Sequence, residues 1–250
     1  MKWKKLSTSR TGDSPLSALG HRQATETGQF LDTWLHEHGF TTAEDITWLS
    51  SPFLRCIETS NGAINAFRRV QGIDQLPIRP EYSVFEWDGH NGEWHKDIPP
   101  MTERKNYFPR LDLNHQSLFV PTLPEPRNQF MERCQMAAHK IDETYPFEQF
   151  RGKVIVIVSH AAGCIMLSKV LTGKELTDIT PAGPCSIYGF TRKSSDKLWT
   201  IDQHDKTGGF NGYTDHLSNQ GSTTVPWNNF GDGTRKFYTG PPTSRFAPSS

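Results

Sequence analysis

The feature that most constrains the fold is the stretch VIVIVSHAAGC, residues 154–164. Its five consecutive β-branched residues, with no polar alternation, are typical of a strand covered on both faces, as in a parallel sheet. The next stretch, residues 161–172, places Ile165 and Leu171 where a helix can bury them, and Gly173 suits the position just after a helix. The sequence therefore predicts a strand-to-helix unit of an α/β protein.

His160 lies at the junction of this predicted strand and helix. In open α/β sheets, ligands bind at the carboxyl ends of the strands, and a helix N-terminus favours an anion there. A histidine at this place can equally well satisfy nearby backbone groups. Its location alone does not decide between the two interpretations, so the functional one requires partner residues.

Apolar periodicity predicts further strands and helices that alternate along the chain. Ala24 and Gly28 give one predicted helix a small-residue face, which we expect to lie against a sheet. The alternation indicates an α/β protein with three layers and a doubly wound, mostly parallel sheet. The predicted strands are residues 46–49, 77–80 and 154–158, with a hairpin of 185–190 and 198–201, and the predicted helices follow Pro15 and Pro52, include residues 130–141, and follow His160.

The chain is predicted to form one domain over residues 1–204. Residues 87–127 are rich in Pro, Asn and scattered aromatics and are too long for an ordinary connection, which is typical of a lid or binding loop. In residues 205–250, Gly, Thr, Asn, Pro and Ser dominate. We expect a poorly ordered or surface-draped tail there.

Charge and composition exclude several classes of function. The chain has 27 basic and 27 acidic residues, so no global field favours nucleic acid or an anionic membrane. No apolar run is long enough to span a bilayer. The four cysteines lack CxxC spacing and are interpreted as reduced thiols of an intracellular protein, cytoplasmic or nuclear. The oligomeric state is left open.

Two further residues are candidate partners for His160. Arg55 follows a predicted strand and two serines and lies in the first turn of a helix, where its guanidinium can hold an oxyanion. Glu86 lies between Phe85 and Trp87, and desolvation there would raise its pKa toward that of a general acid. Each residue alone is as readily interpreted as an ordinary surface side chain.

Together these elements resemble the histidine phosphatase superfamily, the phosphoglycerate-mutase-like proteins, over residues 13–202. The segment DSPLSALGHRQA is similar to an early family motif, SSPFLRCIETS to the S-x-x-x-R-x-x-x-T motif, VFEW to the proton-donor segment, and VIVSHAAG to the strand with the second catalytic histidine. GPCSI is similar to a late family strand. The stretches WKKLSTSRTGDSPLSALG and EWDGHN suggest the eukaryotic branch of suppressor-of-T-cell-signalling phosphatases.

The family opens with a strand that ends in Arg-His-Gly, whose histidine is the nucleophile, and this triplet is absent here. Arg10 is followed by Thr11 and Gly12, and His21 lies on a predicted helix. We favour a truncated chain over a pseudo-enzyme, because His160 and its partners persist. We accordingly expect a gap or poorly supported sheet edge beside residues 154–159.

The resemblance implies the roles of the site residues. Arg55 would hold the non-bridging phosphoryl oxygens, His160 would stabilise charge on them, and Glu86 would protonate the leaving oxygen and activate water. No cofactor or metal is implied, and the stretches HEH and HNGEWH lack a convincing set of four zinc ligands. By position in the matched motifs, the further substrate-binding candidates are Ser51, Thr59, Ser159 and Ala161.

The expected partner is a phosphorylated small molecule or phosphoprotein, and a phosphatase is favoured over a mutase. Aromatic and basic residues of the 87–127 insert can shape a pocket for the organic group, or they can simply cover the core and face solvent. The competing class of function is an inactive, phosphatase-like interaction or phospho-ligand-binding protein. The aromatic and basic residues of the insert are Trp94, Lys96, Arg104, Lys105, Tyr107, Phe108 and Arg110.

Overall fold

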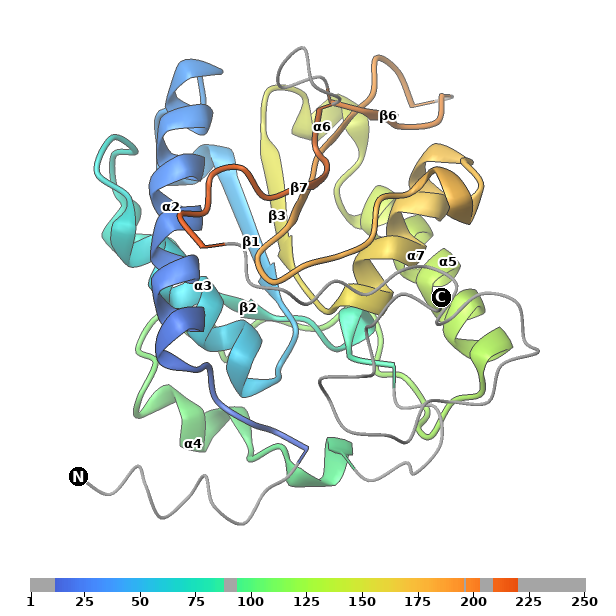
Figure 1. The fold of residues 1–250 in the computed structure, drawn as a ribbon, viewed down its shortest axis with the longest axis horizontal. Helices are drawn as coiled ribbons and strands as arrows, with labels where there is room; N and C mark the ends of the chain where they lie inside the picture. Colours follow the sequence, from blue (N-terminus) through green and yellow to red (C-terminus); the bar gives the residue numbers. More distant parts are fainter. Residues whose placement is uncertain (1–11, 88–93, 196, 203–208, 220–250) are drawn as a thin grey trace.

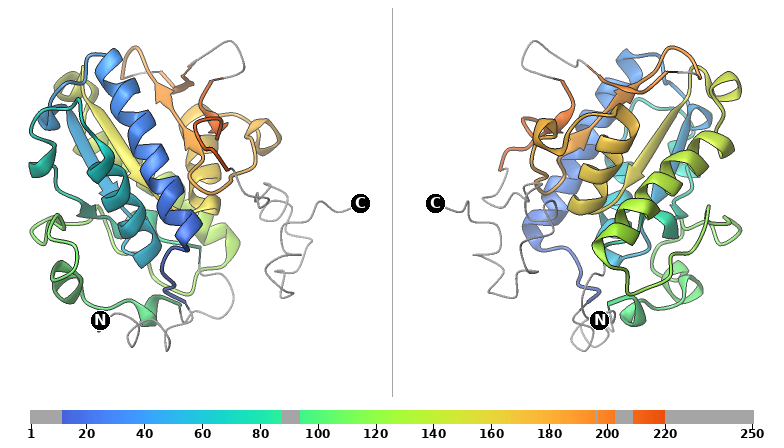
Figure 2. Two further views of the ribbon diagram at one scale, coloured as in Figure 1. Left: turned by 60° about the vertical axis from the view of Figure 1, so that its left-hand side comes forward. Right: turned by 90° about the vertical axis from the view of Figure 1, so that its right-hand side faces the viewer.

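Helices cover both faces of a small parallel sheet in this computed structural model, which describes residues 12–87, 94–195, 197–202 and 209–219 (Figure 1). Helices α2 and α3 lie on one side of the sheet, and α5 and α7 lie on the other, as the turned views also show (Figure 2). The predicted three-layer α/β architecture is therefore confirmed. Within the described ranges, no helix is long and apolar enough to cross a membrane.

The main sheet has the strand order β2-β1-β3, and both pairings are parallel. The predicted strands at 46–49, 77–80 and 154–158 are all present, although the second is shorter than expected. In the register, Ile46 pairs with Val154 and Ser50 with Val158, so β1 and β3 end at the same edge of the sheet. The strands are β1 (Ile46–Ser50), β2 (Arg79–Pro80) and β3 (Val154–Val158).

Strand β3 has a strand neighbour on one side only among the described residues, namely β1. This agrees with the predicted poorly supported edge. All five residues of β3 are half-buried, whereas four of the five in β1 are fully buried. The prediction that both faces of β3 are covered is confirmed, since Val156 and Ile157 pack into apolar clusters on opposite sides of the sheet. The strand is only half-buried because no described strand covers its second edge.

The helices follow the predicted periodicity. On α7, the C-cap Gly173 adopts the left-handed conformation, with φ of 66°, as expected for a terminating glycine. The long helices are α2 (Ala18–Glu37), α3 (Leu54–Ala66), α5 (Arg127–Thr144) and α7 (Ala161–Thr172). The short ones are α4 (Met101–Lys105), α6 (Phe147–Phe150), η1 (Ala43–Asp45), η2 (Ile73–Gln75), η3 (Tyr82–Val84), η4 (Trp94–Asp97) and η5 (Leu176–Asp178).

The small-residue face of α2 packs against helix α3 and not against the sheet. A Cβ atom on Gly28 would lie 2.1 Å from the carbonyl oxygen of Ala63, and one on Gly62 would lie 3.1 Å from Ala24 Cβ. The sequence identified the small face correctly, but the element that it contacts was predicted wrongly. This close contact sets the position of α3 relative to α2.

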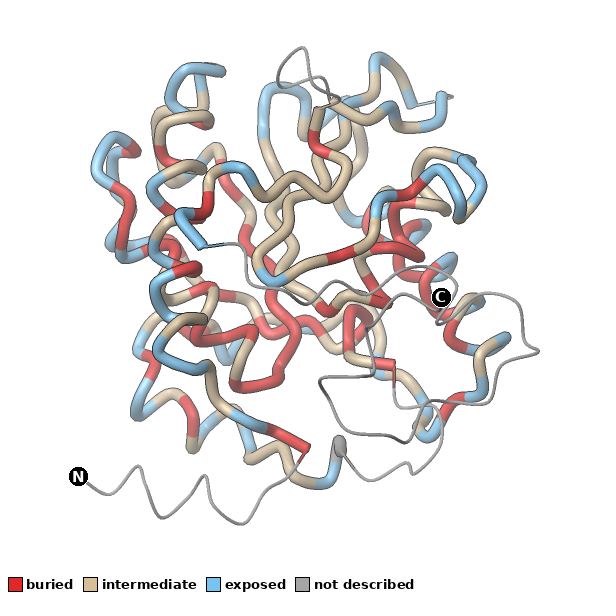
Figure 3. The backbone as a smooth tube through the Cα atoms, viewed as in Figure 1, coloured by how far each residue is buried: buried red, intermediate tan, exposed pale blue. Residues whose placement is uncertain are grey.

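Two apolar clusters fill the space on either side of the sheet. Figure 3 shows the buried residues concentrated in the interior of the molecule. Alternate residues of β3 contribute to both clusters: Val156 faces the α2–α3 cluster and Ile157 faces the α5–α7 cluster. Trp48 and Phe130 are the largest fully buried side chains of the two clusters. All four cysteines are free thiols.

The late part of the chain forms two small antiparallel pairs. The predicted hairpin is present in reduced form as β5–β6, whereas β4 pairs with β7 from the segment expected to be a tail. Phe210 and Leu217 of that segment are buried. Residues 209–219 therefore pack on the domain and are not poorly ordered, while 203–208 and 220–250 lie outside the described residues. The strands are β4 (Ile187–Tyr188), β5 (Phe190–Thr191), β6 (Thr200–Ile201) and β7 (Asn211–Tyr213).

Candidate functional site

The parallel pairing of β1 and β3 places the two key side chains near each other. Arg55 is in the first turn of α3, shortly after β1 ends, and His160 is the N-cap residue of α7, shortly after β3 ends. Because the two strands end at the same level, both helices begin at one edge of the sheet. Two positively charged helix ends therefore point toward the same region.

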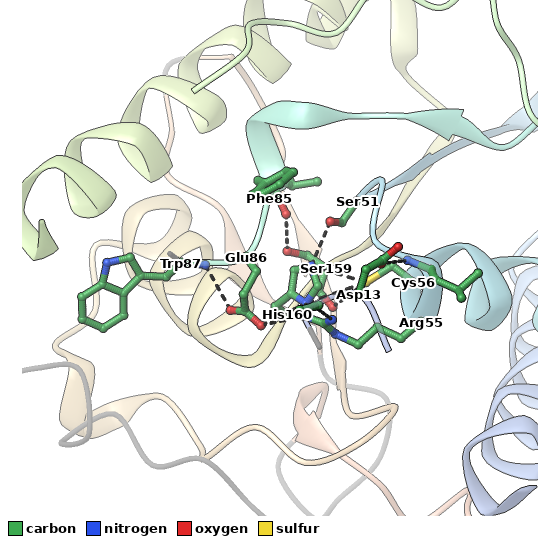
Figure 4. A network of polar contacts seen from close by, with 12 residues as sticks. Asp13, Ser51, Arg55, Cys56, Phe85, Glu86, Trp87, Ser159 and His160 are labelled. Atoms are coloured by element: carbon green, nitrogen blue, oxygen red, sulfur yellow. Dashed lines mark hydrogen bonds and ion pairs between the residues drawn. The ribbon is translucent and has the colours of Figure 1, made fainter. Parts of the chain in front are cut away.

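Glu86 completes a three-residue contact with Arg55 and His160 (Figure 4). Its Oε2 atom lies 3.2 Å from Nη2 of Arg55 and 3.1 Å from Nδ1 of His160. Nη2 of Arg55 lies 3.1 Å from the same imidazole nitrogen. The side chain of His160 is 3% exposed, while those of Arg55 and Glu86 are 26% and 20% exposed, so the site is open on the arginine and carboxylate side.

Glu86 is ionised in this arrangement. Burial alone would raise its pKa, but the facing His160 and Arg55, with the backbone N–H of Trp87, lower it to about 2. The sequence-based expectation of a raised pKa is therefore wrong in this state. Burial alone would lower the pKa of His160, but the facing Cys56 and Glu86 outweigh burial and raise it. The pair thus favours a carboxylate beside a protonated imidazole.

Phe53 forms the apolar floor of the site. Its ring meets the His160 ring edge-on, with centroids 5.0 Å apart, and the Arg55 guanidinium lies 4.4 Å from the Phe53 centroid. Phe53 is fully buried and precedes α3 directly. The same aromatic side chain therefore supports the imidazole and, through a cation–π contact, the guanidinium.

Asp13 orients the start of α3, a contact that was not predicted. Phe53, the N-cap residue of α3, makes no side-chain cap, and Asp13 Oδ1 instead accepts a hydrogen bond of 2.7 Å from the Leu54 backbone N–H. Its second carboxylate oxygen pairs with buried Arg104 of α4. Asp13 opens the DSPLSALG motif, so the resemblance gave a signal, but its partner could not be inferred from spacing.

A second buried ion pair holds the segment that carries Glu86. Nη1 of Arg133, on α5, donates to the carbonyls of Ser83 and Phe85, at 3.0 Å each. Its Nε lies 2.8 Å from Oε2 of Glu125, and both ionic side chains are buried. The Trp87 indole also donates to the Glu125 carbonyl. Neither Arg133 nor Glu125 was identified from the sequence.

The other predicted substrate-binding residues lie close to the site, but their hydroxyl groups are engaged elsewhere. Thr59 donates to the Arg55 carbonyl at 2.8 Å, and Ser159 donates to the Val84 carbonyl at 2.9 Å. Ser51 is fully buried, with its Oγ 2.8 Å from Nε2 of His160. Ala161 is the first residue of α7. Substrate contact by these four residues stays a prediction.

Several insert residues serve the fold and are not part of the Arg55–His160 contact network. Phe108 packs into the α2–α3 cluster, Lys105 donates to the Leu111 carbonyl, and Arg110 donates to the carbonyls of Ile73 and Asp74. Arg104 is used by Asp13. For these residues the structure favours the core-covering interpretation. The side chain of Trp94 lies outside the described residues.

Comparisons with known proteins agree with this geometry. The profile of the histidine phosphatase superfamily (branch 1) matches residues 2–204. A similar solved structure is the ecdysone phosphate phosphatase, EPPase, from Bombix mori in complex with tungstate, with a TM-score of 0.53 and 17% sequence identity over 86% of this chain and 78% of that chain. That likeness supports the phosphoglycerate-mutase-like fold. No match was found among curated proteins, and the suppressor-of-T-cell-signalling branch stays a prediction.

Proposed function

Because this chain belongs to the histidine phosphatase superfamily (branch 1), we propose that its Arg55–His160–Glu86 site binds the phosphoryl group of a phosphomonoester. The expected ligand is a phosphorylated small molecule or phosphoprotein. Hydrolysis through a phosphohistidine is the corresponding reaction of an intact member. The phosphoryl group would enter from the side on which Arg55 and Glu86 are partly exposed.

One observation carries the proposal. A single acceptor, Oε2 of Glu86, faces Nη2 of Arg55 at 3.2 Å and Nδ1 of His160 at 3.1 Å. A phosphoryl oxygen is an anionic acceptor with the same requirements as this carboxylate oxygen. When it replaces Oε2, both donors stabilise the phosphoryl group, and the N-termini of α3 and α7 add favourable potential.

Replacement of Glu86 Oε2 by a phosphoryl oxygen also allows Glu86 to act as a general acid. Its pKa is low because His160 and Arg55 face it. When His160 and Arg55 contact a phosphoryl oxygen instead, the cause of this low pKa is removed. The negative charge of the phosphoryl group raises the pKa of Glu86 further. Glu86 can then hold the proton that the leaving oxygen requires, and later accept one from water.

The three residues of the site bind and protonate but include no attacking group for phosphorus. The 250 residues contain no Arg-His-Gly triplet. Among the side chains that the structure describes, no second imidazole contacts Arg55 or Glu86. This observation favours a second candidate function, a phospho-ligand-binding protein without turnover. In either case the same three residues bind the phosphoryl group.

The test combines binding with turnover. Isothermal titration of the 250-residue chain with orthovanadate or phosphate is expected to show one site, and His160→Ala should weaken it at least about tenfold. Hydrolysis of p-nitrophenyl phosphate should stay at background. Adding an N-terminal strand that ends in Arg-His-Gly should produce chelator-resistant turnover that His160→Ala abolishes. Absence of anion binding, or turnover unaffected by His160→Ala, would contradict the proposal.

A further inference from the structure

The second nitrogen of His160 has a buried partner that the proposed reaction does not use. Nε2 lies 2.8 Å from the Oγ atom of Ser51, on the strand end that follows β1. Ser51 is fully buried and His160 is 6% exposed. The backbone N–H of Ser51 donates to the Val158 carbonyl at 2.8 Å, so the backbone that carries the hydroxyl is held at the end of β3.

The two nitrogens of the His160 ring face different groups. Arg55 and Cys56 face His160 from α3, and Glu86 faces it from the segment after η3. Nδ1 lies 3.1 Å from the Glu86 carboxylate, which can only accept, and 3.1 Å from Nη2 of Arg55, which can only donate, whereas the Cys56 sulfur is 3.6 Å from Nε2 and is only a weak hydrogen-bonding group. Ser51 is therefore the hydrogen-bonding partner of Nε2, which accepts from the hydroxyl when it carries no proton. In the protonated ring Nε2 donates to the same oxygen.

The order Ser51, His160, Glu86 is that of a hydroxyl–imidazole–carboxylate triad, with 2.8 Å and 3.1 Å between the successive partners. A nucleophilic Ser51 would need access to substrate, yet its side chain is completely buried beside the fully buried Phe53. Because it is buried, the hydroxyl can orient the His160 ring but cannot reach a substrate.

We propose that Ser51 is a positioning residue, which holds the His160 imidazole at Nε2 and thereby keeps Nδ1 directed at the site where Arg55 and Glu86 converge. The inference rests on the proposed function for its biological purpose, since the protonated ring, fixed in this way, presents Nδ1–H to a phosphoryl oxygen. A hydroxyl group can satisfy Nε2 in both protonation states of the ring. Ser51 stabilises the charged state more, because charge-assisted hydrogen bonds are stronger than neutral ones.

The chain offers a matched control. Ser50 is also fully buried and precedes Ser51, but its hydroxyl donates to the Ser51 carbonyl at 3.0 Å. Nitrogen-15 NMR of the imidazole is compared in the wild type, Ser50→Ala, Ser51→Ala and Ser51→Thr. Ser51→Ala is expected to lower the pKa of His160 by about half a unit to one unit and to shift the Nε2 resonance. Ser50→Ala and the hydroxyl-retaining Ser51→Thr should leave both unchanged.

The outcomes separate this inference from the proposed function. A wild-type Nε2 resonance without the shift of a hydrogen-bonded nitrogen would overturn the inference even if Ser51→Ala failed to fold. Equal His160 spectra in Ser51→Ala and Ser50→Ala would also overturn it. Titration with orthovanadate is independent of these spectra. A wild type that binds no anion but shows the Ser51-dependent pKa would refute the proposed function alone.

Discussion

Nη2 of Arg55 lies 3.1 Å from Nδ1 of His160, although the two residues are 105 positions apart in the chain. The in-register pairing of Ser50 with Val158 makes this possible, because each side chain follows its strand end within a few residues. Two cationic groups at this distance repel each other unless an anion lies between them. Glu86 supplies that anion in the described structure, and a phosphoryl group is the proposed replacement.

Arg55→Ala is therefore expected to weaken binding of orthovanadate by about 10- to 100-fold, the usual effect of losing a charge-assisted hydrogen bond. Arg55→Lys should recover only part of the affinity, since an ammonium cannot reproduce the planar fork. Calorimetric titration at constant ionic strength measures the effect. Arg68→Ala is the charge-matched control, because Arg68 is exposed and donates to the nearby carbonyls of Asn65 and Phe67. Equal losses for Arg55→Ala and Arg68→Ala would point to a nonspecific charge effect.

Removing the charge of Glu86 is expected to have the opposite effect on binding. Glu86→Gln eliminates the carboxylate that competes for Arg55 and His160, so orthovanadate affinity at pH 7 should rise several-fold, by about 1 kcal/mol or less. Turnover of the chain extended with the Arg-His-Gly strand should fall, because the proton donor is lost. The exposed Glu132→Gln is the control. Weaker anion binding in Glu86→Gln would show that the carboxylate does not compete with the anion.

The sequence predicted the convergence of Arg55, Glu86 and His160 because parallel strands share a carboxyl edge. The pKa of Glu86 was not predictable, since its direction depends on two contacts near 3 Å that no local pattern encodes. The same reason applies to Gly28: periodicity shows that a helix face is small, but not whether a helix or a sheet lies against it. Phe210 was missed because a segment rich in Gly and Asn gave no apolar period.

The lowered pKa of Glu86 predicts acid sensitivity in a defined window. The unfolded carboxyl titrates near 4.5 and the folded one near 2, so the folded state gains stability above pH 4.5 and loses it as pH falls from 4.5 to 2. Wild-type free energy of unfolding should decline there by at most about 3 kcal/mol from this group. Glu86→Gln should flatten that decline in urea denaturation. An unchanged slope would mean that Glu86 is not held by Arg55 and His160.

The lowered pKa of His216 predicts a second pH window in which stability declines, at higher pH than the first. Its Nε2 lies 3.0 Å from Thr27 Oγ1, which donates to the Gln23 carbonyl, so Nε2 carries the proton, while buried Nδ1 has no partner among the described residues. Burial lowers the pKa of His216 to about 4 despite the nearby acidic residues. Between pH 6.5 and 4 the unfolded state binds more protons, so stability falls as pH falls, by at most about 3 kcal/mol. His216→Phe should flatten this window and leave the lower one intact.

The contact between α2 and α3 should be highly sensitive to a single methyl group. A Cβ on Gly28 would lie 2.1 Å from the Ala63 carbonyl oxygen and 2.6 Å from Ala63 Cα, both backbone atoms that cannot move without α3. Gly28→Ala is therefore expected to destabilise the protein by about 1–3 kcal/mol or more. Gly20, in the same helix, offers the control, because the atoms nearest to its added Cβ belong to the Leu16 side chain, the first at 3.2 Å. Gly20→Ala should be neutral or stabilising by up to about 1 kcal/mol in urea denaturation, through helix propensity.

Displacement of α3 also moves Arg55, so Gly28→Ala should weaken orthovanadate binding while Gly20→Ala does not. Equal stability of the two variants would show that α2 and α3 do not approach this closely.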